Sequence, residues 1–364
     1  MRVNKKQNII IFAHQGLGDC IMMLPALSKF ISEDNDYIIY CKSRYESTVF
    51  DLLKKSNIKF EYRHKKVGSI HDAFKLLFFS IKQRIKGVDK IYAPMLPGNI
   101  FYYFILKIIK ALDTYVTNEN YFSSFDILLP AYWNYEGHYV KYFNDFFNIV
   151  DNETTTIYRS INTIMTTDST SENIIGIGPG SGITELNKIP SLEWYIELVK
   201  QLRQNFKNIK FIYYGGGKYD EKLINILEKM YPEISKCLLN MKIEDLITEL
   251  SACKLIISGT TGPGHLASLT TKPLIILANS TNVFESAPYS DKISFITNYN
   301  VFKCAPCYRR NFNNGCGELK CLNTLSHEEV INRVKELFIN SNNLRNDYTL
   351  SYIVKTKNKI HLEI

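Results

Sequence analysis

The chain of 364 residues lacks any apolar run of the roughly 20 residues that a membrane-spanning helix needs. Its longest apolar stretch, residues 100–112, is interrupted by Lys107 and Lys110. We also expect no secretory signal at the N-terminus, because its short apolar stretch leads into a Gly-Leu-Gly-Asp sequence at residues 16–19 and not into a cleavage region. We therefore expect a cytoplasmic protein whose thiols are reduced.

A biased composition is absent as well. Hydrophobic residues make up 45% of the chain and charged residues 22%, which excludes disorder, collagen-like repeats and coiled-coil rods as the main architecture. The length suits two domains of ordinary size. The 24 tyrosines and 21 phenylalanines predict a large core rich in aromatic rings.

Positive charge is concentrated in one segment. The chain has a net charge of +8, and residues 54–90, with 11 basic and three acidic residues, carry the same excess by themselves. Such a patch favours an anionic partner, namely a phosphorylated glycan, an anionic lipid surface or a nucleic acid, and a solvated basic face is the alternative. No nucleic-acid motif accompanies the charge, and Phe74, Phe78 and Phe79 have the spacing of a helix core. We therefore predict no nucleic-acid partner.

Apolar runs alternate with helical patterns in both halves of the chain. Buried strands are expected at residues 8–13, 37–41, 88–93, 174–178, 209–214, 255–258 and 273–278. The repeated strand–helix order predicts an α/β fold with two doubly wound parallel sheets. We expect an N-terminal domain over residues 1–160, a C-terminal domain over 161–340, and a tail over 341–364 that alternates like a β-hairpin.

The first glycine-bearing turn, residues 16–19, follows the first predicted strand. Ligands of open α/β sheets bind outside the carboxyl ends of the strands, so this is a suitable place for chemistry. The carboxylate of Asp19 is either a general base or the cap of the following helix. His14 is a second titratable candidate, although a structural role suits a lone histidine better. The order G-x-G-x-x-G is missing, so the turn is not a dinucleotide fingerprint.

Two further turns occupy matching places in the second half. The turn with Gly180 and Ser181, with Lys188 as the nearest cation, suits a diphosphate, although an ordinary turn is the alternative. The sequence Gly-Thr-Thr-Gly-Pro-Gly-His at 259–265 gathers hydroxyls and amides at a predicted helix N-terminus, which favours anion binding.

Four cysteines lie close together near the end of the second half, at Cys304, Cys307, Cys316 and Cys321. Four thiolates in such a segment suit a tetrahedral zinc or iron site. Four reduced thiols without a metal are the alternative.

Taken in order, these segments resemble glycosyltransferase family 9, the family of the ADP-heptose:lipopolysaccharide heptosyltransferases. The resemblance is carried by residues 10–19, 24–27, 176–180, 214–217 with Asp220 and Glu221, 258–267, and 304–307. It implies a GT-B architecture, in which two Rossmann-like domains face each other across a cleft. It also implies an inverting transfer that requires no catalytic metal or other cofactor.

The resemblance further implies a role for each candidate residue. Asp19 would deprotonate the acceptor hydroxyl. The donor, ADP-heptose, would contact Gly180, Ser181, Lys188, Glu221, Thr260, Thr261, Gly262 and His265. A phosphorylated glycolipid such as the lipopolysaccharide core would meet Gly18 and the cations Arg63, Lys65 and Lys66. Such an acceptor would bring the enzyme to the periphery of the inner membrane.

The sequence departs from the family pattern in three places. Residues 259–261 lack the acid that the family usually has there, and Lys188 stands one residue late without the tryptophan that normally follows. The four cysteines resemble the metal finger of heptosyltransferases that modify autotransporter proteins, so a protein acceptor is an alternative to the glycolipid. A non-catalytic relative that binds glycans or nucleotides is a third reading.

Overall fold

The computed structural model describes thirteen ranges of the chain. They are residues 6–13, 16–41, 44–62, 70–94, 100–118, 126–130, 137–147, 173–181, 188–270, 272–290, 292–302, 304–307 and 320–339. Contacts divide the chain into two compact units, unit 1 over Met1–Thr154 and unit 2 over Thr155–Ile364. The predicted boundary near residue 160 and the predicted tail hairpin lie outside the described ranges.

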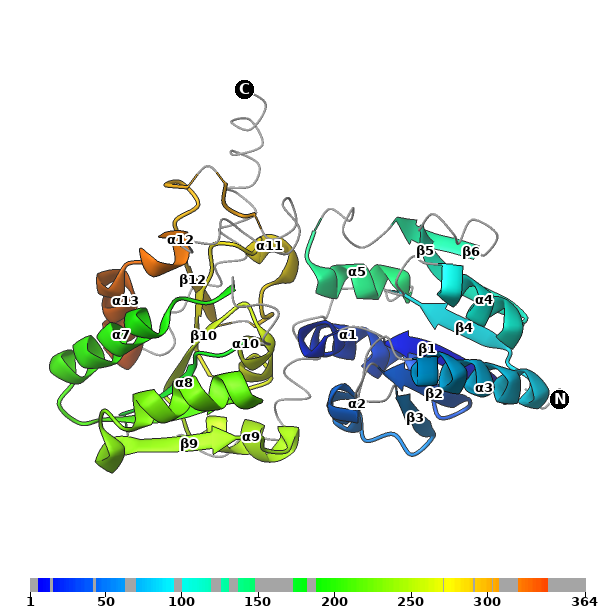
Figure 1. Ribbon diagram of the computed structural model, residues 1–364, viewed down its shortest axis with the longest axis horizontal. Helices are drawn as coiled ribbons and strands as arrows, with labels where there is room; N and C mark the ends of the chain where they lie inside the picture. Colours follow the sequence, from blue (N-terminus) through cyan, green and yellow to red (C-terminus); the bar gives the residue numbers. More distant parts are fainter. Residues whose placement is uncertain are drawn as a thin grey trace, which may run out of the picture. The chain divides into compact units, whose positions relative to one another are not determined.

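Unit 1 contains a six-stranded sheet and five helices within the described ranges (Figure 1). The strands are β1 (Asn8–Ala13), β2 (Asp36–Cys41), β3 (Ile58–Tyr62), β4 (Lys90–Ala93), β5 (Asp113–Asn118) and β6 (Asp126–Pro130). The helices are α1 (Leu17–Phe30), α2 (Arg44–Asp51), α3 (Ile70–Lys86), α4 (Ile100–Ile109) and α5 (Tyr139–Phe146). Neighbouring strands are parallel and follow the order β3-β2-β1-β4-β5-β6.

Unit 2 repeats this plan. Its strands are β7 (Asn173–Gly178), β8 (Ile209–Gly215), β9 (Ser235–Leu239), β10 (Leu255–Gly259), β11 (Leu274–Leu277) and β12 (Ile293–Ile296). Its helices are α7 (Leu192–Asn205), α8 (Lys218–Glu228), α9 (Ile243–Leu250), α10 (Gly262–Ala267), α11 (Val283–Ser286), α12 (Lys320–Asn323) and α13 (His327–Ile339), with a 3-10 turn at Pro232–Ile234. The sheet is again parallel, in the order β12-β11-β10-β7-β8-β9.

Both strand orders are those of a Rossmann fold, with a reversal of direction beside the first strand of each sheet. The predicted α/β class with two doubly wound parallel sheets is therefore confirmed. The reversal lies between β1 and β4 in unit 1 and between β7 and β10 in unit 2. These are the positions at which open α/β sheets bind ligands, because the helices after the two strands depart to opposite faces.

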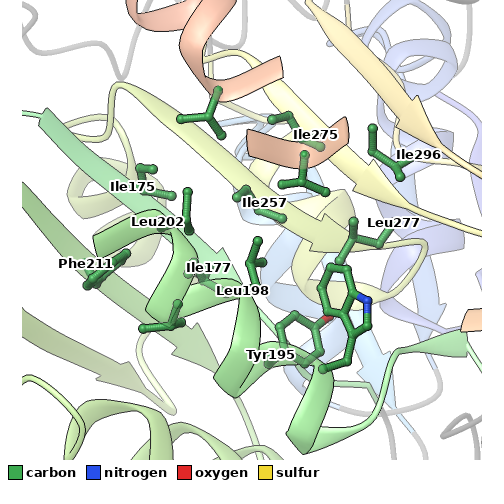
Figure 2. Packing of buried hydrophobic residues seen from close by; sticks show 14 of the residues in the cluster. Ile175, Ile177, Tyr195, Leu198, Leu202, Phe211, Ile257, Ile275, Leu277 and Ile296 are labelled. Carbon is green, nitrogen blue, oxygen red and sulfur yellow. The ribbon is translucent and has the colours of Figure 1, made fainter. Parts of the chain in front are cut away.

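The cores follow from the strand sequences. In unit 2 the isoleucines of the central strands pack against α7 and α13, and Figure 2 shows Leu198 and Leu202 of α7 among Ile175, Ile177 and Ile257. Helix α7 begins after the N-cap Ser191, whose hydroxyl accepts a hydrogen bond from the Trp194 amide. In unit 1 the core beneath α3 and α4 is a separate cluster of aliphatic and aromatic side chains. Within the described ranges no helix is long and apolar enough to cross a membrane.

Candidate functional site

The switch point of unit 2 is formed by the turns that follow β7 and β10. The Thr261 hydroxyl donates to the Gly180 carbonyl at 2.9 Å, and the Ser258 hydroxyl donates to the Gly178 carbonyl at 2.8 Å. These bonds join residues some 80 positions apart in the sequence. The structure thus brings together two of the turns that the sequence predicted as donor-binding.

Close backbone approach explains two glycines of the β7 turn. A methyl group at Gly180 would overlap the carboxylate of Asp220, and one at Gly178 would lie 2.5 Å from the ring of Tyr214. Neither position has room for a side chain without displacing a buried group. The turn after β7 therefore rests directly on side chains from β8 and α8.

Asp220 is a buried carboxyl group at this site. This residue, 3% exposed, lies in the first turn of α8. One of its carboxylate oxygens accepts a hydrogen bond from the Gly216 amide at 3.1 Å. Burial raises the pKa of this carboxyl to about 6, while the Gly216 and Ser181 amides act in the opposite direction. Asp220 thus links the glycine turn after β8 to the Gly180 turn after β7.

The backbone amides of the glycine turn after β8, at Gly216 and Gly217, donate hydrogen bonds to side chains of the protein. Gly217, with a φ of +88°, caps α8, and its amide donates to the Asn240 side chain at 2.9 Å. Glu221, a predicted donor contact, lies beside Asp220 on the exposed side of α8. Sequence reasoning selected the exposed acid and missed its buried neighbour. The available signal was an acid at the third helical position after a glycine cap, which commonly reaches back to a free amide.

The turn after β10 holds the remaining predicted donor residues. The Thr260 hydroxyl donates to the Thr281 hydroxyl at 2.9 Å, so this turn is also joined to the loop after β11. Lys188 lies beside the turn, because its carbonyl would be 3.4 Å from a methyl group on Gly259. Gly262 begins the six-residue helix α10, on which His265 is buried. Both threonine hydroxyls are thus engaged within the protein, and the loop after β11 is a further element that sequence reasoning missed.

The switch point of unit 1 carries Asp19. Helix α1 begins after Gly16, and Asp19 is the acid of its first turn, partly exposed like its neighbour Gly18. The following residues, from Cys20 to Leu27, are all buried and anchor the helix. Asp19 is therefore held at the carboxyl end of β1 by a helix that cannot shift without disturbing the core. His14 lies outside the described ranges.

The predicted acceptor cations Arg63, Lys65 and Lys66 lie outside the described ranges. The structure does describe the helix that follows them, and here one expectation was wrong. Phe79 is buried as predicted, but Phe74 and Phe78 are exposed. The three rings do not share one helix face, because the buried stripe of α3 runs through Leu76, Phe79, Ser80 and Gln83.

The proposed metal site receives no support. Cys321 is buried in the core of unit 2, whereas Cys304 is exposed and Cys316 lies outside the described ranges. Among the described residues, no three histidine, cysteine or acidic side chains are grouped so that they could hold a metal ion. The Cys321 carbonyl accepts a hydrogen bond from the Asn279 side-chain amide at 2.9 Å, and this bond fixes α12 against the loop after β11. The position of Cys321 thus serves packing in the described part of the chain.

Comparison of sequences identifies related proteins. The family profile described as Glycosyltransferase family 9 (heptosyltransferase) matches residues 142–316. The chain is 22% identical to Lipooligosaccharide heptosyltransferase 2 of Campylobacter jejuni over 175 aligned residues. The aligned region covers 47% of this chain and 52% of the relative. The chain thus spans about half the length of the curated relatives that it matches.

Comparison of structures covers nearly the whole chain. The Escherichia coli ADP-heptose lipopolysaccharide heptosyltransferase II superposes with a TM-score of 0.66 at 12% identity, over 92% of this chain and 99% of that chain. The E. coli heptosyltransferase WaaC, solved with ADP-2-deoxy-2-fluoro heptose, gives a TM-score of 0.62 at 14% identity, over 91% and 99%. At these identities the likeness shows a shared fold.

Proposed function

Since residues 142–316 match the profile of glycosyltransferase family 9, we propose that this chain is a glycosyltransferase that uses a nucleotide-diphosphate sugar. The observation that carries the proposal is the interlocked set of turns around Gly180. Three loops meet at the carboxyl ends of β7, β8 and β10, and the Thr261 hydroxyl and the Asp220 carboxylate hold the Gly180 turn between them. A glycine turn fixed from both sides presents its remaining backbone amides to a diphosphate at little entropic cost.

The donor in this proposal is ADP-heptose. The support comes from relatives: the curated matches are lipooligosaccharide heptosyltransferases, and WaaC has been solved with an ADP-heptose analogue. The acceptor is then a phosphorylated surface glycan such as the lipopolysaccharide core, and the reaction takes place in the cytoplasm at the inner membrane. A protein acceptor, the alternative, depended on the four-cysteine segment, whose described part gives it no support.

Asp19 is the general base of the proposed reaction. Its carboxylate accepts the proton of the acceptor hydroxyl while the hydroxyl oxygen attacks the anomeric carbon of the donor sugar. The bond from this carbon to the diphosphate oxygen breaks on the opposite side, so the nucleoside diphosphate leaves and the configuration inverts. The rigid attachment of α1 to the core keeps this carboxylate in place.

The first test is a calorimetric titration of the full chain with ADP, UDP, GDP and ADP-heptose. Selective binding of ADP and ADP-heptose is expected. Preference for another nucleotide would retain the glycosyltransferase and refute the donor. Absence of binding to every nucleotide would refute the proposal in favour of the non-catalytic relative.

A further inference from the structure

Helix α3 buries one face in unit 1 and carries an exposed apolar stripe on the opposite side. The buried face of the helix is formed by its own residues Leu76, Phe79, Ser80 and Gln83. On the opposite side, Phe74 is 65% exposed, Phe78 72%, Ile81 44% and Ile85 81%. Their spacings of four, three and four residues place all four side chains in one narrow stripe along the helix. A soluble helix normally directs charged side chains to this side.

Cations flank the stripe on both sides. Lys75, Lys82 and Lys86 follow one edge and Arg84 lies at the other, and all four are exposed. Residues 73–86, whose side chains the structure describes on α3, include no acid. The neighbouring helix α4, which packs beside α3 (Figure 1), adds exposed Phe104 and Lys107. The combination is that of a helix lying in the plane of a membrane interface, with rings and aliphatic chains below and cations at headgroup level.

We propose that the exposed face of α3 docks unit 1 onto an anionic lipid bilayer. Phe74, Phe78, Ile81 and Ile85 enter the interface, and the flanking cations meet the phosphates of acidic lipids. The cations favour this occupant over a second copy of the chain, because two such faces would bring like charges together. The 17-residue helix is about 25 Å long, and its exposed apolar stripe runs from Phe74 to Ile85.

The docking face is placed usefully for a lipid-linked acceptor, and this step rests on the proposed function. Helix α3 connects β3 to β4 in a parallel sheet, so it begins at the sheet edge that holds Asp19 and runs away from it. The predicted acceptor cations Arg63, Lys65 and Lys66 come a few residues before it in the sequence. A membrane contact along α3 would therefore leave the Asp19 edge beside the bilayer surface.

The test is flotation of the purified full chain with vesicles, which requires neither donor nor acceptor. Binding is expected to vesicles that contain phosphatidylglycerol, to be weaker on phosphatidylcholine alone, and to decrease with salt. Phe74→Ser/Phe78→Ser and Lys75→Glu/Lys82→Glu should each reduce binding roughly tenfold or more. The matched controls in unit 2, Ile339→Ser and Lys200→Glu/Lys222→Glu, should bind as the unmodified chain does.

Three results would overturn the docking proposal. One is equal flotation of the α3 variants and their controls. Another is a dimer in sedimentation that Phe74→Ser/Phe78→Ser dissociates, which would assign the face to a second copy. The third is binding of RNA or DNA at physiological salt that Lys75→Glu/Lys82→Glu abolishes. Nucleotide titration of the same variants separates these outcomes from failure of the glycosyltransferase proposal. Because α3 lies in unit 1 and the donor turns lie in unit 2, the α3 variants should keep the nucleotide affinity of the unmodified chain.

Discussion

The two units share one strand order and differ in what they add to it. In unit 2 the turns at the carboxyl edge are joined by hydroxyl and carboxylate contacts. The exposed large hydrophobic side chains among its described residues, Ile226, Val301 and Ile339, are widely spaced in the sequence. In the described part of unit 1 the edge carries Asp19, while α3 exposes four large apolar residues. Under our proposals, the same scaffold would serve two purposes: unit 2 would bind the donor in a fixed site, and unit 1 would supply the base and the surface contact.

The sharpest test of this comparison is Asp19→Asn. If unit 1 supplies the base and unit 2 binds the donor, turnover should fall by about 10²–10⁴-fold while donor affinity is retained. Initial rates with ADP-heptose and calorimetric affinity for ADP measure the two effects. Glu33→Gln, an exposed acid of the same unit, is the control. Near-normal turnover of a folded Asp19→Asn protein would remove Asp19 from the mechanism.

Gly180→Ala tests the crowded turn of unit 2. The added methyl group overlaps the Asp220 carboxylate, so we expect a loss of about 3 kcal/mol in the free energy of unfolding and weaker ADP binding. Urea denaturation and calorimetry measure both. Gly216→Ala is the control, because its methyl group would be 3.7 Å from its nearest neighbour. The double variant Gly180→Ala/Asp220→Ala should recover part of the loss, and strict additivity would refute the clash.

The buried carboxylate should make the stability of unit 2 depend on pH. Because the pKa of Asp220 rises from 3.8 to about 6 on folding, the folded state binds the proton more tightly than the unfolded state. Stability is therefore greatest below about pH 4 for this group and falls as the pH rises to about 6, by on the order of 2–3 kcal/mol. Asp220→Asn should flatten this dependence in urea denaturation between pH 4 and 7. Glu221→Gln, its exposed neighbour, should preserve the slope; a wild-type slope in Asp220→Asn would contradict the assignment.

The smallest effect is expected for Thr261→Val. The substitution keeps the shape and leaves the Gly180 carbonyl without its hydroxyl donor, which should cost about 1 kcal/mol in thermal or urea unfolding. Thr248→Val, whose hydroxyl bonds only within the exposed surface of α9, should change little. Equal stability losses in both variants would mean that the β7–β10 connection has no special weight.

Strands were predictable where both faces of the sheet are covered. The strands β1, β7 and β10 are continuous apolar runs, and each occurs at the predicted place. Strands β3, β5, β6, β9 and β12 were not predicted, and all of them except β5 are edge strands. The runs of β3 and β9 contain charged residues such as Lys59 and Lys236. Their pairing comes from the neighbouring strand, which a local pattern does not contain.

The sequence by itself determined the α/β class, the resemblance to family 9, which the profile match confirms, and the glycine turns after the strands. These are local properties, since consecutive residues set both the apolar periodicity and the conformation that a turn requires. Only the tertiary structure decided that Asp220 and not Glu221 is buried against Gly180, that Cys321 belongs to the core, and that Phe74 and Phe78 face outward. Each of these depends on which segment, distant in the sequence, covers the side chain, and packing alone sets that choice.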